Sequence, residues 1–341
     1  MRYLVTGGAG YIGSHIVLAL LDAGHEVEII DNLSTGHREV VPSAARLHEV
    51  DLRYGAALAP IFGAHRWDGV FHLAALSIVG ESMRDPLHYL EHNFTSSLNL
   101  IRSCTQQGVR KLVFSSTAAL FGGPDRHSAI TEDAAIIPGS VYGESKFFIE
   151  RTLHWADRVH GLRSACLRYF NAAGADPNGR AGEDHKPETH LIPLALDAML
   201  RRRRALQIFG TDYETPDGTC IRDYTHVSDI AAAHICVLDV LDHRSVAYNL
   251  GTGTGHSNLD VLKSIARVSG RDVPWHEAER RAGDPSVLVA DATSLTRDTG
   301  WTPRYAAIDQ IIETAIAWRT RHPDGYGNAA SQVDVASVMR R

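Results

Sequence analysis

The stretch T-G-G-A-G-Y-I-G at residues 6–13 decides the fold. It follows an apolar run that begins at Tyr3, and it contains Gly7, Gly10 and Gly13 at the spacing G-x-x-G-x-x-G. Residues without a Cβ atom permit a tight turn and let a pyrophosphate approach the backbone, where the free N–H groups of a following helix bind it. The stretch therefore predicts a strand, a phosphate-binding loop and a helix.

Short apolar runs alternate with helical stretches through the first half of the chain. The runs that we expect to form strands cover residues 3–6, 27–31, 69–73, 111–115 and 164–168. Strands separated by helices build a parallel sheet with helices on both faces. The sequence thus predicts an α/β fold, a Rossmann-like doubly wound parallel sheet with a smaller C-terminal α/β substrate domain.

A Gly-, Pro- and Asp-rich segment at residues 171–184 marks the expected boundary between the two domains. Helical patterns follow at residues 191–200, 228–241 and 258–269. We expect the Rossmann domain over residues 1–175, the substrate domain over residues 176–325 and a tail over residues 326–341. Some segments of the second domain are expected to return to the first.

Charge and composition argue against several classes of protein. The 341 residues carry a net charge of −6, whereas nucleic-acid binders concentrate excess Lys and Arg. No apolar run approaches the roughly 18 residues that a membrane span requires, and the chain begins directly with a strand pattern.

The four cysteines are widely spaced, which favours reduced thiols; they are Cys104, Cys166, Cys220 and Cys236. We expect a cytoplasmic protein that binds neither nucleic acid nor membrane.

Three features that suggest further ligand sites have simpler explanations. The 19 histidines include no H-E-x-x-H motif or comparably spaced carboxylate cluster, so we expect no metal site. The segment G-T-G-T-G at residues 251–255 has no x-x-G completion, which favours a structural turn. Arg201 to Arg204 follow a helix whose C-terminal carbonyls favour cations, which predicts a solvated helix end.

An acidic residue ends the second expected strand. The run V-E-I-I-D ends at Asp31, 23 residues beyond Gly8. At this position a carboxylate accepts hydrogen bonds from the ribose diol of adenosine and repels a 2′-phosphate. Together with the glycine-rich loop, Asp31 favours NAD over NADP as the cofactor.

Tyr142 and Lys146 lie four residues apart in Y-G-E-S-K, on one face of a helix that Ser140 can cap. A phenol with a pKa of about 10 is a poor base at neutral pH, but a neighbouring ammonium favours its ionised form. We therefore expect Lys146 to lower the pKa of Tyr142. Upstream, Thr117 follows the fourth expected strand and offers a hydroxyl able to relay a proton. These three residues are the candidate catalytic group.

The order of these motifs resembles the extended short-chain dehydrogenase/reductase superfamily. It runs from T-G-G-A-G-Y-I-G through Asp31-Asn32-Leu33 and S-S-T to Y-G-E-S-K. Four later segments are similar to the UDP-glucose 4-epimerase family: L-R-Y-F-N-A-A-G-A-D-P, E-T-H-L-I-P, I-F-G-T-D-Y-E-T-P-D-G-T-C-I-R-D-Y-T-H-V and R-R-A-G-D-P. The similarity extends from residue 1 to about residue 325, and the third of these segments is the most specific.

This resemblance implies a homodimer that binds NAD in the first domain and a UDP-hexose between the domains. By matching position, the residues that would bind NAD are Gly7, Gly10, Tyr11, Ile12, Gly13, Asp31, Asn32, Asp51, Leu52, Leu73, Ala74, Ala75, Asn93, Ser115, Tyr142, Lys146, Tyr169 and Phe170. Those that would bind the substrate are Thr117, Tyr142, Asn171, His190, Leu191, Gln207, Ile208, Phe209, Arg222, Tyr224, Arg281, Asp284 and Leu288. Among the latter, Asn171, Arg222 and Arg281 would hold the diphosphate.

The resemblance also implies a reaction, the interconversion of UDP-galactose and UDP-glucose through a 4-keto sugar. Tyr142 would act as the base, Lys146 would tune it and Thr117 would relay the proton. Related dehydratases and decarboxylases are an alternative, but they carry an acid directly after the strand hydroxyl, where this chain has Ala118 and Ala119. A non-catalytic NAD-sensing protein is a second alternative, and such proteins typically lose the Tyr or the Lys.

One departure from the family pattern concerns the range of substrates. Leu288 stands where some relatives carry a Tyr that lines the pocket beside carbon 2 of the hexose. Leucine is smaller, and an apolar pocket discriminates by only about 1 to 3 kcal/mol for a change of one methylene. We therefore expect UDP-galactose to be preferred, with measurable turnover of UDP-N-acetylhexosamines.

Overall fold

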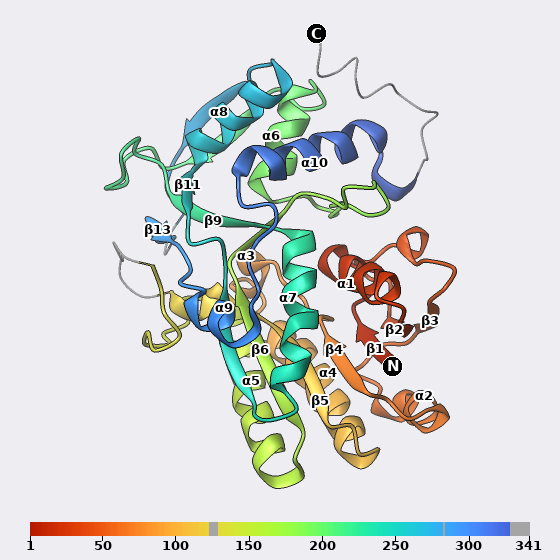
Figure 1. Ribbon diagram of the computed structural model, residues 1–341. Coiled ribbons are helices and arrows are strands. Elements are labelled where there is room, and N and C mark those ends of the chain that lie inside the picture. The colour runs from red at the N-terminus through yellow and green to blue at the C-terminus, as the bar shows by residue number, and fades with distance from the viewer. Residues whose placement is uncertain (123–128, 282–283, 328–341) are drawn as a thin grey trace.

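Seven parallel strands form one sheet in a computed structural model of the protein, which describes residues 1–122, 129–281 and 284–327 (Figure 1). In spatial order they are β10 (Val246–Leu250), β6 (Arg163–Tyr169), β5 (Lys111–Thr117), β4 (Gly69–His72), β1 (Arg2–Thr6), β2 (Glu26–Asp31) and β3 (Arg46–Glu49). The strand order reverses between β1 and β4. Open α/β sheets bind their ligands outside the carboxyl ends of the strands at such a point.

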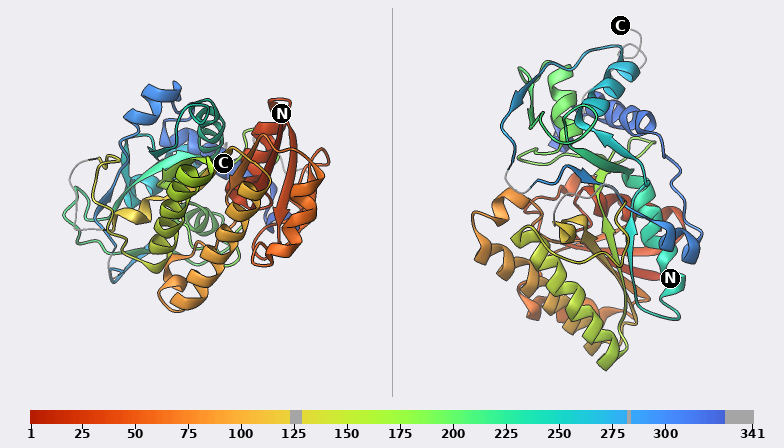
Figure 2. Two further views of the ribbon diagram at one scale, coloured as in Figure 1. Left: turned by 90° about the horizontal axis from the view of Figure 1, so that it is seen from below. Right: turned by 90° about the vertical axis from the view of Figure 1, so that its left-hand side faces the viewer.

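Helices cover both faces of the sheet because its central strands are apolar on both sides. β1 and β4 are buried along nearly their whole length, which is typical of a parallel sheet packed on two faces. On one face lie α1 (Tyr11–Asp22) and α7 (Val227–Val240), and on the other lie α2 (Ala59–Ala64), α4 (Pro86–Gln106) and α5 (Val141–His160). The right-hand view of Figure 2 shows the sheet between these two layers of helices.

The upper part of the molecule in Figure 1 has a hydrophobic core of its own, with buried side chains such as Leu196, Ile265 and Ile312. They come from α6 (Leu191–Met199), α8 (Asn258–Ser269) and α10 (Ile308–Arg321). β9 (Ile221–His226) pairs with β7 (Asn171–Ala173), β11 (Gly255–Ser257) and β13 (Val287–Leu288), and β8 (Leu206–Phe209) pairs with β12 (Trp275–Ala278). Of two short helices, α3 (Val79–Ser82) contacts α4 and α5, and α9 (Thr293–Thr299) contacts α7 and β10.

The fold class predicted from the sequence is confirmed. The five expected strands correspond to β1, β2, β4, β5 and β6, with ends within two residues of those predicted. The sequence does not predict β3, a short edge strand with the polar sequence R-L-H-E. β10 pairs with β6 and α7 packs on α1, so later segments do return to the sheet. The domain boundaries near residues 175 and 325 stay a prediction, and residues 328–341 of the expected tail lie outside the described residues.

The segment at residues 251–255 forms a turn around a buried carboxylate. Asp223 accepts hydrogen bonds from the backbone N–H groups of Thr252 at 2.9 Å and Gly253 at 3.0 Å. This arrangement confirms the structural explanation of the glycines. Arg201 to Arg204 lie just beyond α6, where Arg202 donates to the carbonyl of Arg319 at 3.1 Å.

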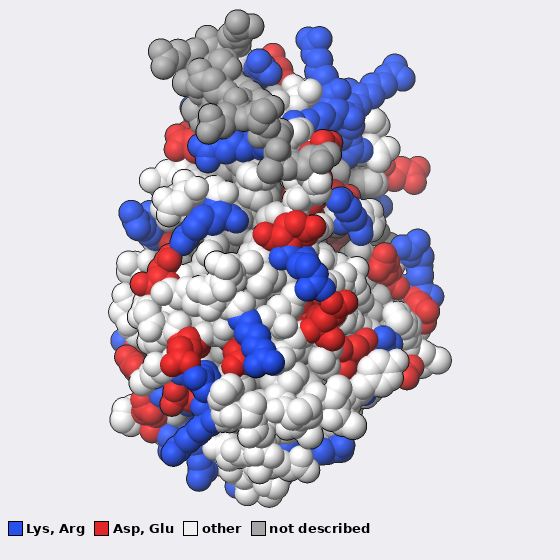
Figure 3. Space-filling view, turned by 90° about the vertical axis from the view of Figure 1, so that its right-hand side faces the viewer, with Lys and Arg blue, Asp and Glu red and all other residues white. Residues whose placement is uncertain are grey.

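Figure 3 shows one face of the molecule, on which Lys and Arg side chains lie interspersed with Asp and Glu side chains over the part that contains the sheet. Neighbouring charges there compensate each other, unlike the continuous positive stripe of a nucleic-acid binder. Within the described ranges, no helix combines the length and the apolar character that crossing a membrane requires.

Candidate active site

A pocket of about 460 Å³ opens where the strand order of the sheet reverses. One wall, here named the sheet wall, is formed by the loops after β1, β2, β4 and β5 together with Tyr142 and Lys146 of α5. The opposite wall, here named the upper wall, is formed by Asn171, Glu183, His185, Lys186, Pro187, His190, Arg222 and Leu288. A more open groove of about 620 Å³ lies beside Arg201 to Arg204, and none of the predicted site residues lines it.

The loop after β1 has no room for side chains at its glycines. Gly7 has a φ of 71°, and a Cβ atom there would lie 2.6 Å from the backbone nitrogen of Ala74. A Cβ atom on Gly13 would lie 2.0 Å from the carbonyl oxygen of Gly7. Gly10, which precedes α1, has no side chain to cap the helix, so the first N–H groups of α1 face the pocket without a side-chain partner. The loop therefore fits a pyrophosphate that approaches the backbone.

Asp31 ends β2 and lines the pocket. Its two carboxylate oxygens each accept one backbone hydrogen bond, from Ala9 at 3.0 Å and from Leu33 at 2.9 Å. Each oxygen retains further acceptor capacity, which is what a ribose diol requires. Burial raises the pKa of Asp31, while the two backbone donors oppose that change.

The candidate catalytic side chains converge from β5 and α5. Ser140 caps α5 by accepting a hydrogen bond from Gly143 N at 3.2 Å, as the sequence predicts. The hydroxyl of Thr117 interacts with the phenol of Tyr142 and acts to lower its pKa. One turn along the helix, Lys146 donates from Nζ to the carbonyl oxygen of Ser115 at 2.9 Å, and Nζ lies 5.8 Å from the centre of the Tyr142 ring. All three predicted residues thus lie on the sheet wall.

Comparisons with known proteins agree with this geometry. The family model described as "NAD dependent epimerase/dehydratase family" matches residues 3–251. The chain belongs to this family. It is 47% identical over 330 residues to a UDP-glucose 4-epimerase of Lacticaseibacillus casei, covering 96% of this chain and 99% of that protein.

Solved structures give the same result. A crystal structure of a UDP-glucose 4-epimerase matches with a TM-score of 0.93 at 45% identity, covering 96% of this chain and 100% of that one. The Bifidobacterium longum UDP-glucose 4-epimerase, solved in complex with NAD+ and UDP, matches with a TM-score of 0.90 at 34% identity and covers 95% of this chain and 100% of that one. This member of the NAD dependent epimerase/dehydratase family is therefore an epimerase that uses NAD, in agreement with the prediction.

Burial changes the titration of both α5 residues. It raises the pKa of Tyr142 well above its ordinary value, and the hydrogen bond from Thr117 only partly opposes this. Burial also lowers the pKa of Lys146 to about 7, although Glu150 opposes that shift. In the protein chain by itself burial of the phenol sets the direction of the Tyr142 shift, and the expectation that Lys146 lowers this pKa stays a prediction.

Sequence motifs give no indication of the buried ion pair beneath this site. Glu150, one turn beyond Lys146, accepts hydrogen bonds from Arg168 Nη2 at 2.6 Å and from Ser116 Oγ at 2.6 Å. Both side chains of the Arg168–Glu150 pair are less than one-tenth exposed. The pair ties α5 to β5 and β6 and so fixes the helix that carries Tyr142.

Most of the predicted cofactor residues line the pocket. Asn93 and Ser115 are the exceptions. Asn93 accepts a hydrogen bond from Leu76 N at 2.8 Å and donates to Leu76 O at 3.0 Å, so it fixes the loop after β4. Ser115 contributes its carbonyl to Lys146, and its hydroxyl forms a hydrogen bond with Tyr169.

The predicted substrate residues fall into two groups. Those that line the pocket are Thr117, Tyr142, Asn171, His190, Arg222 and Leu288, and those that do not are Leu191, Gln207, Ile208, Phe209, Tyr224, Arg281 and Asp284. Asp284 nevertheless accepts a hydrogen bond from Arg222 at 2.5 Å. The guanidinium of Arg281 lies 4.2 Å from the centre of the Phe209 ring, so these two residues contact each other at the end of β8.

Proposed function

We propose that the protein interconverts UDP-galactose and UDP-glucose through a 4-keto sugar. The observation that carries the proposal is that Thr117 and Tyr142 line the same pocket as the glycine-rich loop and Arg222. A base on one wall and a guanidinium on the other suit a sugar joined to a diphosphate, because an Arg fork matches phosphate oxygens. The names of the similar enzymes support this substrate class.

In this proposal Tyr142 accepts the proton of the 4-hydroxyl while carbon 4 loses a hydride, and the C–O bond becomes a ketone. Bound NAD would supply the hydride acceptor and later the donor, together with a positive charge that favours the Tyr142 phenolate. The hydroxyl of Thr117 relays the proton to and from Tyr142. When the ketone turns its other face, Tyr142 returns the proton and the product carries the inverted hydroxyl.

The residues of the sheet wall fit NAD. Gly7 and Gly13 let the loop backbone pack closely, which leaves the uncapped start of α1 at the pocket to bind a pyrophosphate, and Asp31 can accept hydrogen bonds from the adenosine ribose. We propose that Lys146 also binds the nicotinamide ribose. On the upper wall, Asn171 and Arg222 would hold the diphosphate of the sugar nucleotide.

Dehydratase or decarboxylase chemistry has less support. After Thr117 the pocket presents Ala118 and Ala119, at the start of the short helix η3 (Ala118–Phe121). Elimination of water or loss of carbon dioxide needs a further acid or base beside the ketone. A non-catalytic NAD-sensing role is disfavoured because Tyr142 and Lys146 are both in place.

We propose that the chain forms a homodimer through α4 and α5. Phe148, Trp155 and Val159 are 46%, 56% and 67% exposed and lie at helical spacing on α5. Leu87 on the neighbouring α4 is 77% exposed. Sedimentation velocity should show a dimer that Trp155→Glu dissociates and Trp275→Glu, on β12, does not. A monomeric wild type at micromolar concentration would remove this proposal.

We also propose a cytoplasmic location, because the four cysteines are free thiols of the kind that a reducing compartment maintains.

The function is tested by incubating purified protein with UDP-galactose and measuring UDP-glucose. We expect conversion to a fixed equilibrium ratio from either direction without added cofactor, and acid-denatured protein should release NAD or NADH. Formation of a dehydrated or decarboxylated sugar nucleotide instead would establish the alternative reaction, and release of NADP would contradict the role of Asp31.

A further inference from the structure

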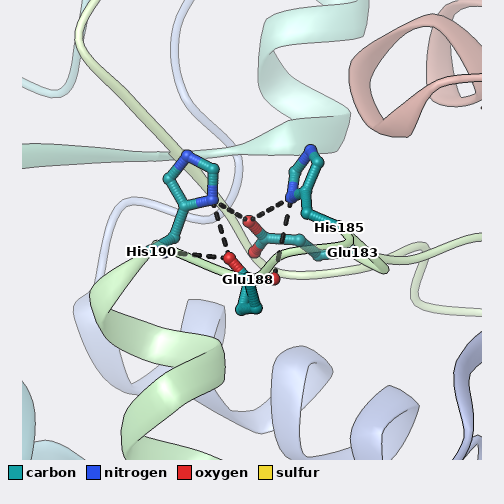
Figure 4. A group of neighbouring side chains, drawn as sticks. All are labelled: Glu183, His185, Glu188 and His190. Atoms are coloured by element: carbon teal, nitrogen blue, oxygen red, sulfur yellow. Dashed lines mark hydrogen bonds and ion pairs between the residues drawn. The ribbon is translucent and has the colours of Figure 1, made fainter. Parts of the chain in front are cut away.

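Four side chains of the loop between β7 and α6 converge at the upper wall. Glu183, His185, Glu188 and His190 each offer one donor atom, and these atoms all lie within 4.8 Å of one another. Figure 4 shows the two carboxylates between the two imidazoles, with both rings pointing Nδ1 inward. The spacing E-x-H-x-x-E-x-H differs from that of H-E-x-x-H and the other common metal-binding motifs, so the cluster becomes visible only in the fold.

The distances between donor atoms suit a single small cation. Nδ1 of His190 lies 2.9 Å from Glu183 Oε1 and 3.0 Å from Glu188 Oε1. Nδ1 of His185 lies 3.2 Å from Glu183 Oε1 and 3.7 Å from Glu188 Oε2. Zinc in tetrahedral coordination holds its ligand atoms at about 2.0–2.1 Å, which puts neighbouring ligand atoms about 3.3 Å apart. The four distances between donor atoms lie on both sides of this value.

Burial gives a second, independent indication of a ligand. The Glu183 side chain is only 6% exposed. Its Oε1 atom and Nδ1 of His185 are both buried and lie 3.2 Å apart as an ion pair, but among the described residues neither atom has a partner in hydrogen-bond geometry. Leaving a buried polar atom without a hydrogen bond costs about 1–3 kcal/mol, and more for a charged group. A cation between the two atoms would satisfy both.

We propose that Glu183, His185, Glu188 and His190 bind one divalent transition-metal ion of the zinc class. Two imidazole nitrogens favour zinc over magnesium or calcium, which prefer oxygen ligands. The two carboxylates balance the charge of a divalent ion. This proposal revises the expectation of no metal site.

The proposed ion would fix the upper wall rather than take part in the chemistry. Four protein ligands leave no open position, which is the pattern of a structural zinc site. The ion would link His190 to the segment that contains Lys186 and Pro187. These three residues line the pocket. His185 also contacts the ring of Tyr11, with 5.9 Å between ring centres, so the site lies against the glycine-rich loop.

Metal binding is tested by titrating Co2+ and Zn2+ into protein that has been treated with a chelator, and by recording the visible absorption. We expect one ion per chain, and Co2+ should give the intense visible absorption of tetrahedral coordination, which Zn2+ removes and Mg2+ does not. Zn2+ should also raise the thermal unfolding midpoint. Absence of tetrahedral Co2+ absorption in the wild type, or binding of several ions with equal affinity, would overturn the proposal.

Matched variants locate the ion. Glu183→Gln keeps the shape of the side chain and should weaken binding at least roughly 100-fold, since even the loss of outer partners costs 10–100-fold. His243→Gln changes an exposed histidine after α7 and should bind as the wild type does. If Glu183→Gln does not fold, His185→Gln provides the same comparison. Equal affinity in the wild type and in a folded cluster variant would place the ion elsewhere and refute the site.

Discussion

The two walls of the pocket hold their side chains by different means. On the sheet wall the backbone fixes them: Lys146 donates to the carbonyl of Ser115, and Asp31 accepts from Ala9 N. On the upper wall opposite charges fix them, as where Arg222 pairs with Asp284 and His190 with Glu183. The sheet wall is therefore already organised for its ligand, whereas an anion that binds Arg222 competes with Asp284.

Because the two walls hold their side chains differently, we expect substitutions on each wall to have different kinetic effects. Substitutions on the sheet wall should lower kcat or remove the cofactor, because its positions are set before binding. Those on the upper wall should mainly change KM or substrate preference.

Tyr142→Phe should lower kcat by at least about 100-fold, because it removes the base and leaves the packing of the ring intact. Bound NAD and the unfolding midpoint should remain close to those of the wild type. Steady-state kinetics with UDP-galactose provide the measurement. Activity within a few-fold of wild type would remove Tyr142 from the mechanism.

Gly13→Ala should yield protein with little or no NAD. The added Cβ atom would lie 2.0 Å from the carbonyl oxygen of Gly7, so the loop must move away from the position that suits a pyrophosphate. The readout is the ratio of NAD to protein after acid denaturation. Gly63→Ala on α2 is the control, since a Cβ atom there meets no atom within 4 Å. Full NAD content in Gly13→Ala would contradict the proposed position of the pyrophosphate.

Lys146→Met should abolish most activity yet stabilise the NAD-free protein at pH 7. The pKa of Lys146 falls from 10.5 to about 7 on burial, so the folded protein binds this proton less tightly than the unfolded chain does. The destabilisation by Lys146 therefore grows as the pH falls from about 10.5 to about 7 and is constant below that. It amounts to a few kcal/mol at pH 7.

The measurement is the free energy of unfolding of wild type and Lys146→Met between pH 7 and pH 10. The advantage of the variant should shrink as the pH rises. If the difference in unfolding free energy between variant and wild type stays constant or increases with pH, the buried ammonium of Lys146 is not the cause of the destabilisation.

Arg222→Lys should raise KM for the sugar nucleotide about 10-fold and change kcat little. Lysine keeps the charge but loses the planar fork that matches phosphate oxygens. Arg319→Lys is the control, because Arg319 is also paired with an Asp, donating from two nitrogens to Asp197, but lies outside the pocket. A fall in kcat with KM unchanged would show that the upper wall takes part in the chemical step.

Leu288→Tyr should give the smallest effect and the most selective one. Leu288 lines the pocket, and a bulkier ring there should lower kcat/KM for UDP-N-acetylgalactosamine while leaving that for UDP-galactose nearly unchanged. Specificity constants for both substrates, in wild type and variant, provide the comparison. Equal losses for the two, or no N-acetyl turnover by the wild type, would remove Leu288 as a determinant of specificity.

The two walls also differ in how far the sequence predicts them. The sheet wall follows from local patterns, because Gly7 to Gly13, Asp31 and Tyr142 lie directly after strands or within one turn of a helix. The upper wall depends on tertiary contacts: Arg222 meets Asp284 across 62 residues. The sequence also contains no indication that burial raises the pKa of Tyr142, because desolvation depends on what packs around the ring.

The central claim is that one hydride leaves carbon 4 and returns to it inside the pocket. UDP-galactose labelled with deuterium at carbon 4 tests this directly, with the product analysed by mass spectrometry and NMR after turnover in ordinary water. Epimerisation through Tyr142 and bound NAD predicts UDP-glucose that retains the deuterium at carbon 4. Loss of deuterium to solvent, or its appearance at another carbon, would contradict the mechanism.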